Sequence, residues 1–168
     1  MPKGFFNPHN LGGEYLDLEE NIRLGTPTAV FGVSQPHKAL IAASCLPCRA
    51  VYVADNAQTA ARMAAEIAGF SGEEPALLCA KDEVLLYKDA VSKDALFRRL
   101  NALWRIQCGA RLAVCDVESL MQLFPVRVDS ISLQEGEELD FLGLPARLVR
   151  LGYTRAATVE SKGQFALR

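Results

Sequence analysis

The sequence contains no long hydrophobic run. Apolar stretches such as Leu112–Cys115 fall far short of the roughly 20 residues that cross a bilayer. The first residues, MPKGFFNPHNLGGEY, contain neither the apolar core nor the small-residue cleavage pattern of a secretory signal. Charge of one sign is also scarce, because 18 basic and 20 acidic residues leave a net charge of −2. We therefore expect a soluble, cytoplasmic protein with no membrane partner, in which only a local basic patch could attract nucleic acid.

Groups for acid–base and metal chemistry are few. The two histidines are His9 and His37, and no Ser–His–Asp set can be assembled from them. The five cysteines are odd in number, and most lie in apolar runs, where a cysteine such as Cys115 is typically a small buried side chain. Cys45 and Cys48 form a C-x-x-C pair, but no second ligand pair follows at zinc spacing, and the pair closes a helix instead of opening one. We expect a structural role for it.

Between residues 28 and 116, short β-rich runs alternate with helical patterns. Half of the 168 residues are apolar, which is enough to build a real core. The predicted strands are Thr28–Val33, Arg49–Ala54, Pro75–Ala80 and Arg111–Asp116. The predicted helices are Pro36–Leu46, Ala57–Phe70 with Asn56 as its cap, Lys93–Gln107, and Glu118–Phe124, which Pro125 stops. Strands separated by helices imply crossover connections, so the pattern predicts an α/β fold whose mostly parallel sheet has helices on both faces.

The helix Lys93–Gln107 is strongly amphipathic. The residues near its apolar face are Leu96, Leu100, Leu103, Trp104 and Gln107. We expect that face to pack on the sheet and the arginines Arg98, Arg99 and Arg105 to be more exposed. These arginines offer one further hypothesis, weak duplex binding, although the net charge and the lack of an aromatic platform argue against it.

The pattern changes after Pro125. The predicted elements are a half-exposed strand at Val126–Leu133, a helix from Asp140 to Leu151 that Gly152 ends, and a hairpin of Ala156–Glu160 with Gln164–Arg168. This predicts a small α+β subdomain over 126–168, preceded by the α/β subdomain over 28–125 and an N-terminal tail or helix over 1–27. Because the sequence ends within a strand-like run, we expect it to be cut from a longer chain.

The loop after the first predicted strand partly matches a phosphate-binding loop. Gly32 and Lys38 stand at the spacing of G-x-x-x-x-G-K-[ST], between a strand and a helix. His37 replaces the second glycine, and Ala39 replaces the residue whose hydroxyl would hold Mg²⁺. Pro36 removes one amide from the cradle. We expect no nucleotide or metal on this remnant, and weak anion binding at the helix N-terminus is the alternative.

An acidic residue, Asp116, follows the last predicted strand, with Glu118 just beyond it. This is the arrangement of a carboxylate that holds Mg²⁺ in a nucleotide site. Because the loop offers neither the hydroxyl nor the amides to hold a metal–nucleotide pair, we expect Asp116 to cap the helix that follows.

Taken together, three segments resemble the N-terminal, UvrB-like module of bacterial transcription-repair coupling factors (Mfd proteins): Asp82–Ile106, Val117–Pro125 and Gly136–Arg168. The family's E-x-L-P-Y-D, S-P and R-L-x-x-L elements are matched at Glu83, Leu85, Tyr87, Ser92, Arg99, Leu100 and Leu103. Its G-Y and V-E-x-x-G-E-[FY]-A-x-R elements are matched at Gly152, Tyr153, Val159, Glu160, Gly163, Phe165, Ala166 and Arg168. The sequence departs from the pattern at Leu86, Lys88, Lys93 and Gln164.

The resemblance implies a fold and a role. It implies a RecA- or helicase-like first subdomain that has no ATPase activity, so that this chain is not an enzyme. It also implies that the α+β subdomain binds UvrA. The module would be an adaptor that recruits UvrA in transcription-coupled nucleotide excision repair, with Arg168, Phe165 and Arg155 at the contact. ATP, Mg²⁺, RNA polymerase and double-stranded DNA would belong to other domains of the parent, an ATP-dependent DNA translocase. The alternative is a nucleotide-binding helicase or ATPase half-domain with an atypical loop.

Overall fold

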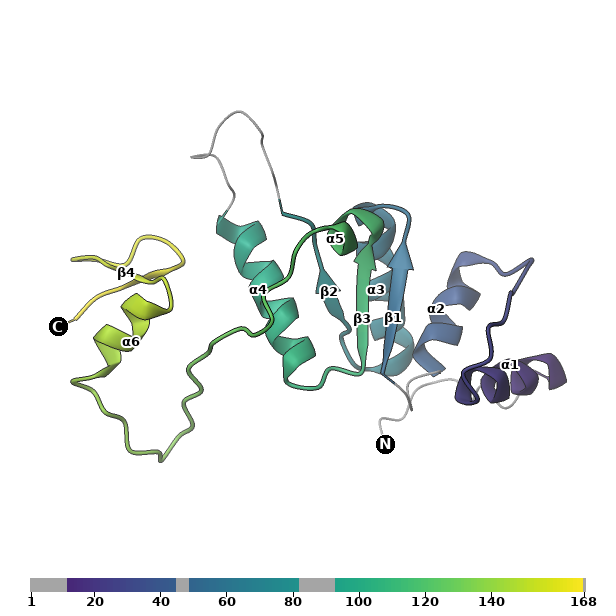
Figure 1. Ribbon diagram of the computed structural model, residues 1–168, viewed down its shortest axis with the longest axis horizontal. Helices are drawn as coiled ribbons and strands as arrows, with labels where there is room; N and C mark the ends of the chain where they lie inside the picture. Colours follow the sequence, from purple (N-terminus) through teal and green to yellow (C-terminus); the bar gives the residue numbers. More distant parts are fainter. Residues whose placement is uncertain (1–11, 45–48, 82–92, 168) are drawn as a thin grey trace.

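A computed structural model describes residues 12–44, 49–81 and 93–167 (Figure 1). Its helices are α1 (Gly13–Arg23), α2 (Gln35–Ser44), α3 (Ala57–Ser71), α4 (Lys93–Gln107), α5 (Val117–Met121) and α6 (Leu144–Arg150). Its strands are β1 (Ala50–Ala54), β2 (Ala76–Leu78), β3 (Leu112–Asp116), β4 (Thr154–Arg155) and β5 (Gln164–Phe165). The sequence-based predictions for His9, Cys45, Cys48, Glu83, Leu85, Leu86, Tyr87, Lys88, Ser92 and Arg168 lie outside the described residues. None of the described helices is long and apolar enough to cross a membrane.

The first three strands form one parallel sheet in the order β1-β3-β2. β1 runs in register with β3 from Ala50 opposite Leu112 to Ala54 opposite Asp116. In the chain, α3 stands between β1 and β2, and α4 between β2 and β3, as crossover connections require. The predicted α/β architecture with a parallel sheet is therefore confirmed for these strands.

Helices cover both faces of this sheet, α2 and α3 on one face and α4 on the other (Figure 1). On one face, α2 and α3 bury the larger core cluster of Ala39, Ala54, Ala60, Met63, Ala64, Ile67, Leu112 and Val114. On the other face, Ala102 and Leu103 of α4 pack against Leu78 and Cys115. The cover on this second face is incomplete, because Val51 and Val53 of β1 are 60% and 45% exposed.

Two helix caps match the sequence-based prediction. The Asn56 side-chain oxygen accepts the Thr59 N–H at 2.8 Å and begins α3, which satisfies a backbone donor that has no partner within the helix. Asp116 caps α5 in the same way, since its Oδ1 accepts the Ser119 N–H at 2.7 Å. α5 itself is shorter than expected and ends at Met121.

The first predicted strand, Thr28–Val33, was wrong. These residues have irregular backbone between α1 and α2, and the side chains of Val30 and Phe31 are 47% and 89% exposed. A β-rich run becomes a strand only where a neighbouring strand takes its backbone hydrogen bonds. Within the described part of the chain, no strand lies beside this run.

The second wrong prediction is a strand at Val126–Leu133, which is also irregular. The side-chain amide of Gln107 donates to the Val128 carbonyl at 3.1 Å and accepts the Val128 N–H at 2.8 Å. The side chain of α4 therefore provides both hydrogen bonds that a neighbouring strand would have provided at this residue.

The C-terminal end also differs from the prediction. α6 begins at Leu144, because the residues from Asp140 to Gly143 form a turn. In this turn the Asp140 side chain accepts the Gly143 N–H and the Asp140 backbone carbonyl accepts the Leu144 N–H, each at 3.0 Å. Gly152, with φ +87°, follows its last turn as expected. The predicted hairpin was wrong: β4 and β5 pair in parallel, since residues 156–163 loop back to the start of β4.

Candidate functional site

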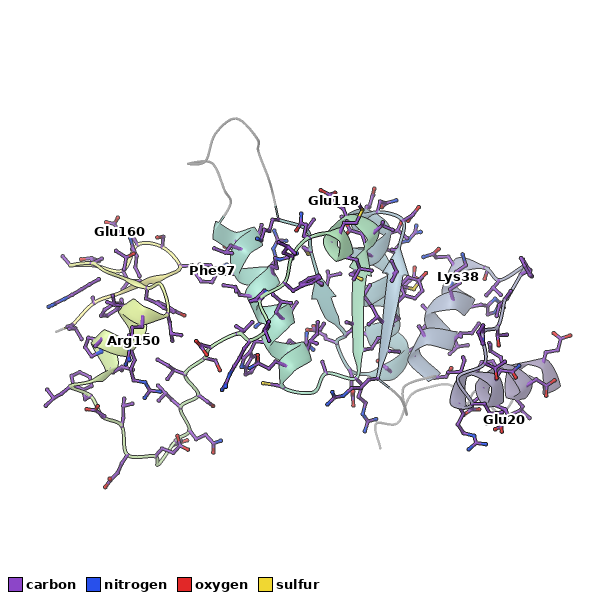
Figure 2. The ribbon with its side chains drawn as sticks, in the orientation of Figure 1. Glu20, Lys38, Phe97, Glu118, Arg150 and Glu160 are labelled. Carbon is purple, nitrogen blue, oxygen red and sulfur yellow. The ribbon has the colours of Figure 1, made fainter. Side chains whose placement is uncertain are left out.

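The phosphate-loop remnant has a geometry of its own. Gly32 adopts a left-handed φ of +72°, and the Ser34 hydroxyl lies 2.8 Å from His37 Nδ1. Lys38 is exposed on the first turns of α2 (Figure 2). Ala39, which stands at the position of the metal-binding hydroxyl, is completely buried in the core cluster under α2. A side chain at position 39 therefore faces the core, and the exposed groups of the remnant are the lysine ammonium and the imidazole.

Asp116 is engaged inside the protein. Its side chain is 3% exposed and capped onto Ser119, whose own hydroxyl donates to the Leu78 carbonyl at 3.2 Å. Glu118 is exposed on the first turn of α5 (Figure 2). Across the residues that the structure describes, no group of three or more His, Cys, Asp or Glu side chains could hold a metal ion.

The C-terminal unit, which we define as residues 140–167, brings two of the predicted contact residues together. Arg155 of β4 and Phe165 of β5 are opposite each other in the parallel pair. The Arg155 side chain is exposed, whereas Phe165 is buried, with 9% exposure. Arg168 lies outside the described residues. The role of these three residues in binding stays a prediction, and Phe165 would act by supporting the surface that Arg155 presents.

Among the described residues, an ion pair and an aromatic contact join the C-terminal unit to α4. Lys162 Nζ lies 2.6 Å from Asp94 Oδ1, and the hydrogen bond to Lys162 lowers the pKa of the Asp94 carboxyl. Beside this ion pair, Phe97 projects from α4 toward the C-terminal unit (Figure 2) and packs against Gly163, where a Cβ would lie 3.0 Å from the ring. Gly163 also has a φ of +82°, so both space and conformation favour glycine there.

An open cleft of about 1190 Å³ lies between α3, α4 and the C-terminal unit. Its apolar lining comes mainly from Ala61, Ala65, Leu100, Trp104, Ile131 and Leu148. The charged residues that border it are Glu74, Asp94, Arg98, Arg105, Asp129 and Lys162.

Arg99 corrects the prediction for α4 and is the residue that sequence reasoning missed. It was expected to be exposed, but it is 2% exposed, while Leu96 and Trp104 of the expected packing face are 42% and 38% exposed. The buried residues of α4 are Ala95, Arg99 and Ala102, at helical spacing, and Leu103 of the expected face also packs on the sheet. An alanine one turn before Arg99 and another one turn after it allow the helix to approach the sheet closely. This spacing of small residues was the signal in the sequence that could have placed Arg99 on the buried face.

The Arg99 guanidinium joins α4 to the carboxyl end of the sheet. Nη1 donates to the Cys79 carbonyl at 2.6 Å, and Cζ lies 5.0 Å from the centre of the Phe124 ring, which is a cation–π distance. Nη2 is buried without a hydrogen-bond partner in the described part of the chain. Burial lowers the pKa of Arg99 from its usual value.

These features define a class: a parallel α/β domain whose loop only partly matches a phosphate-binding loop, followed by a small α+β unit. No family model matches the sequence. The chain is 34% identical over 132 residues to a transcription-repair-coupling factor of Myxococcus xanthus. This alignment covers 70% of the chain and 11% of the relative. Proteins of the same name from Mycobacterium bovis and Mycobacterium tuberculosis are 34% identical over 117 residues, or 63% of this chain and 10% of each relative.

The predicted resemblance to transcription-repair-coupling factors is therefore confirmed. The chain spans about a tenth of the length of the curated relatives that it matches.

Proposed function

We propose that this chain is a non-catalytic module of a transcription-repair-coupling factor, and that it acts in transcription-coupled nucleotide excision repair as an adaptor that recruits UvrA. The observation that carries the proposal is the similarity to coupling factors over 70% of the chain. The RecA- or helicase-like assignment of the sheet domain and the UvrA-binding assignment of the C-terminal unit belong to the same proposal. RNA polymerase, duplex DNA, ATP and Mg²⁺ are partners of other regions of the longer parent, a DNA translocase.

The geometry of the loop supports a role without catalysis. Ala39 is buried where a nucleotide site would need an exposed hydroxyl, and Asp116 is engaged as a helix cap. The hydroxyl that would hold Mg²⁺ is thus missing at Ala39, and the carboxylate of Asp116 is already engaged as the cap of α5. Lys38 alone can supply one positive charge to an anion.

The proposed UvrA contact is the exposed surface of the C-terminal unit around Arg155, together with Arg168, which follows that unit in the sequence and lies outside the described residues. An arginine next to an aromatic side chain is a frequent energetic centre of protein interfaces. Arg155 is exposed, and Phe165 lies directly across from it in the strand pair. Phe165 is buried and positions β5, so it is the support of this surface.

A binding measurement with purified UvrA tests the proposal. Immobilised wild-type chain is compared with Arg155→Ala, Arg168→Ala and the matched control Arg150→Ala, which removes an exposed arginine from α6 of the same unit. We expect binding by the wild type, a loss of tenfold or more in each of the first two variants, and no change in the control. Equal binding by all four chains would refute the assigned surface, and no binding by the wild type would refute the adaptor role.

The same preparation separates this function from the nucleotide-binding alternative. Titration calorimetry with Mg-ATP should give no measurable heat of binding. Micromolar affinity that Lys38→Ala abolishes would replace the adaptor proposal with a nucleotide-binding one.

A further inference from the structure

The C-terminal unit buries little of the apolar surface that it carries. Among residues 140–167, all of which the structure describes, Phe165 is the only buried side chain, and α6 buries none of its residues. A helix of seven residues is marginal by itself in water, so α6 needs another surface on which its apolar face can pack. That face consists of Leu144, Leu148 and Leu151, which stand at helical spacing and are only half-buried. We call these three residues the leucine row.

The outer face of α4 carries a matching apolar row. Phe97, Leu100 and Trp104 also stand at helical spacing. At 3.6 residues per turn, they lie on the side of the helix opposite the buried Arg99 and Ala102. Trp104 is 38% exposed, and Phe97 and Leu100 are half-buried. Since the opposite side of α4 packs on the sheet, this outer row needs a partner from elsewhere.

Both rows line the same cleft. All six side chains border the open cavity of about 1190 Å³ that lies between α4 and α6 (Figure 1). Near the start of α4, the ion pair of Lys162 with Asp94 and the contact of Gly163 with Phe97 already join the two parts. Trp104 lies ten residues beyond Asp94, or about 15 Å along the helix. The C-terminal unit is therefore joined to one end of α4, and the cleft extends toward the other end.

The connection between the two parts permits a rotation. Gln107 holds Val128, and from residue 129 to residue 143 the chain contains no helix or strand. Segments of this kind absorb the changes in φ and ψ that a hinge requires. With the ion pair as the pivot, a rotation of about 20° moves the far side of the C-terminal unit by about 5 Å, since the lever arm is the 15 Å length of helix given above.

We propose that the C-terminal unit closes on α4, so that the leucine row packs on Phe97, Leu100 and Trp104 and the cleft is shut. The structure shows the open form. The removal of both apolar rows from water stabilises the closed form. A partner that binds either row must first open the cleft, so the closure controls access to the outer face of α4.

Trp104 is the single tryptophan of the sequence, so its fluorescence reports on the closure without a label. The experiment measures the emission maximum and the quenching by acrylamide in the full wild-type chain and in Leu148→Asp. The matched control is Val149→Asp, because Val149 is 57% exposed on the same helix and does not line the cleft. Leu148→Ala is a second, milder variant that introduces no charge, and circular dichroism checks the folding of all four chains.

We expect Trp104 of the wild type to be protected from acrylamide at every protein concentration. Leu148→Asp should raise the ratio of open to closed molecules about tenfold or more, because the closed form buries this leucine. Its emission should move to longer wavelength and its quenching should increase, Leu148→Ala should change in the same direction by less, and Val149→Asp should match the wild type.

Three results would overturn the proposal. Equal quenching in the wild type and in both Leu148 variants would mean that the cleft stays open. An equal change in Val149→Asp would mean that the leucine row has no special part in protecting Trp104. Protection that increases with protein concentration would mean that a second copy of the chain, and not the C-terminal unit, covers α4.

Discussion

Replacing Arg99 should destabilise the sheet domain far more than replacing the arginine beside it. Arg99→Ala removes a charged, part-buried hydrogen bond to the Cys79 carbonyl, worth about 1.5–3 kcal/mol. It also removes the stack on Phe124, worth about 1 kcal/mol. Part of this loss is offset because the guanidinium no longer has to be desolvated with Nη2 unpaired. We expect a net decrease of about 2–3 kcal/mol in the free energy of unfolding.

Urea denaturation followed by circular dichroism measures this effect. With a slope of about 2 kcal/mol per molar urea, the midpoint should fall by about 1–1.5 M. Arg98→Ala is the matched control, because Arg98 is exposed on the same helix, and its midpoint should change by less than about 0.3 M. Arg99→Met keeps the packing volume and loses only the polar contacts, so it should lie between the two. Equal midpoints for Arg99→Ala and Arg98→Ala would refute the idea that Arg99 ties α4 to the sheet.

Two further predictions concern the loop and the C-terminal unit. Ala39→Ser puts a hydroxyl into a completely buried site, so we expect the free energy of unfolding, measured by thermal denaturation, to fall by about 1–2 kcal/mol. Calorimetry should still detect no binding of Mg-ATP, and a gain of affinity would contradict the placement of this residue in the core. Because the pKa of Asp94 is lowered, its ion pair with Lys162 is fully formed above the ordinary value of 3.8 and is lost as the pH falls through the lowered value. The radius of gyration from X-ray scattering should therefore rise below pH 3.8 in the wild type more than in Asp94→Asn, and identical curves would count against the contact.

Local signals in the sequence predicted the elements that depend on local physics. The cap at Asn56, for example, needs only a side-chain oxygen and an N–H three residues further on. The helix Lys93–Gln107 was predicted with the bounds that the structure has. The strand at β3 was recognised by its continuous apolar run, which is typical of a strand buried on both faces.

The errors arose where a distant partner decides the outcome. Thr28–Val33 has the composition of a strand, but composition contains no information about whether a neighbour is present. Val126–Leu133 alternates correctly, yet the side chain of Gln107, 21 residues before Val128, takes its hydrogen bonds. Arg99 was placed on the wrong face because the hydrophobic pattern of α4 favours the leucines, whereas the sheet accepts the smaller alanines at close distance.

For the candidate site, the sequence predicted what the loop lacks, and the structure adds where the substitutes lie. The burial of Ala39 could not be read from the motif, because it depends on how α2 packs on α3. The contact between Lys162 and Asp94 joins residues 68 positions apart, and no local pattern announces it.

Several contacts join α4 to the residues after α5: Gln107 bonds Val128, Asp94 pairs with Lys162 and Phe97 packs on Gly163. A helix of 15 residues is about 22 Å long, so a tilt of about 5° displaces its end by about 2 Å. Such a displacement is enough to separate the atoms of a hydrogen bond. A change in the tilt of α4 on the sheet would therefore also move the C-terminal unit or break its contacts with α4.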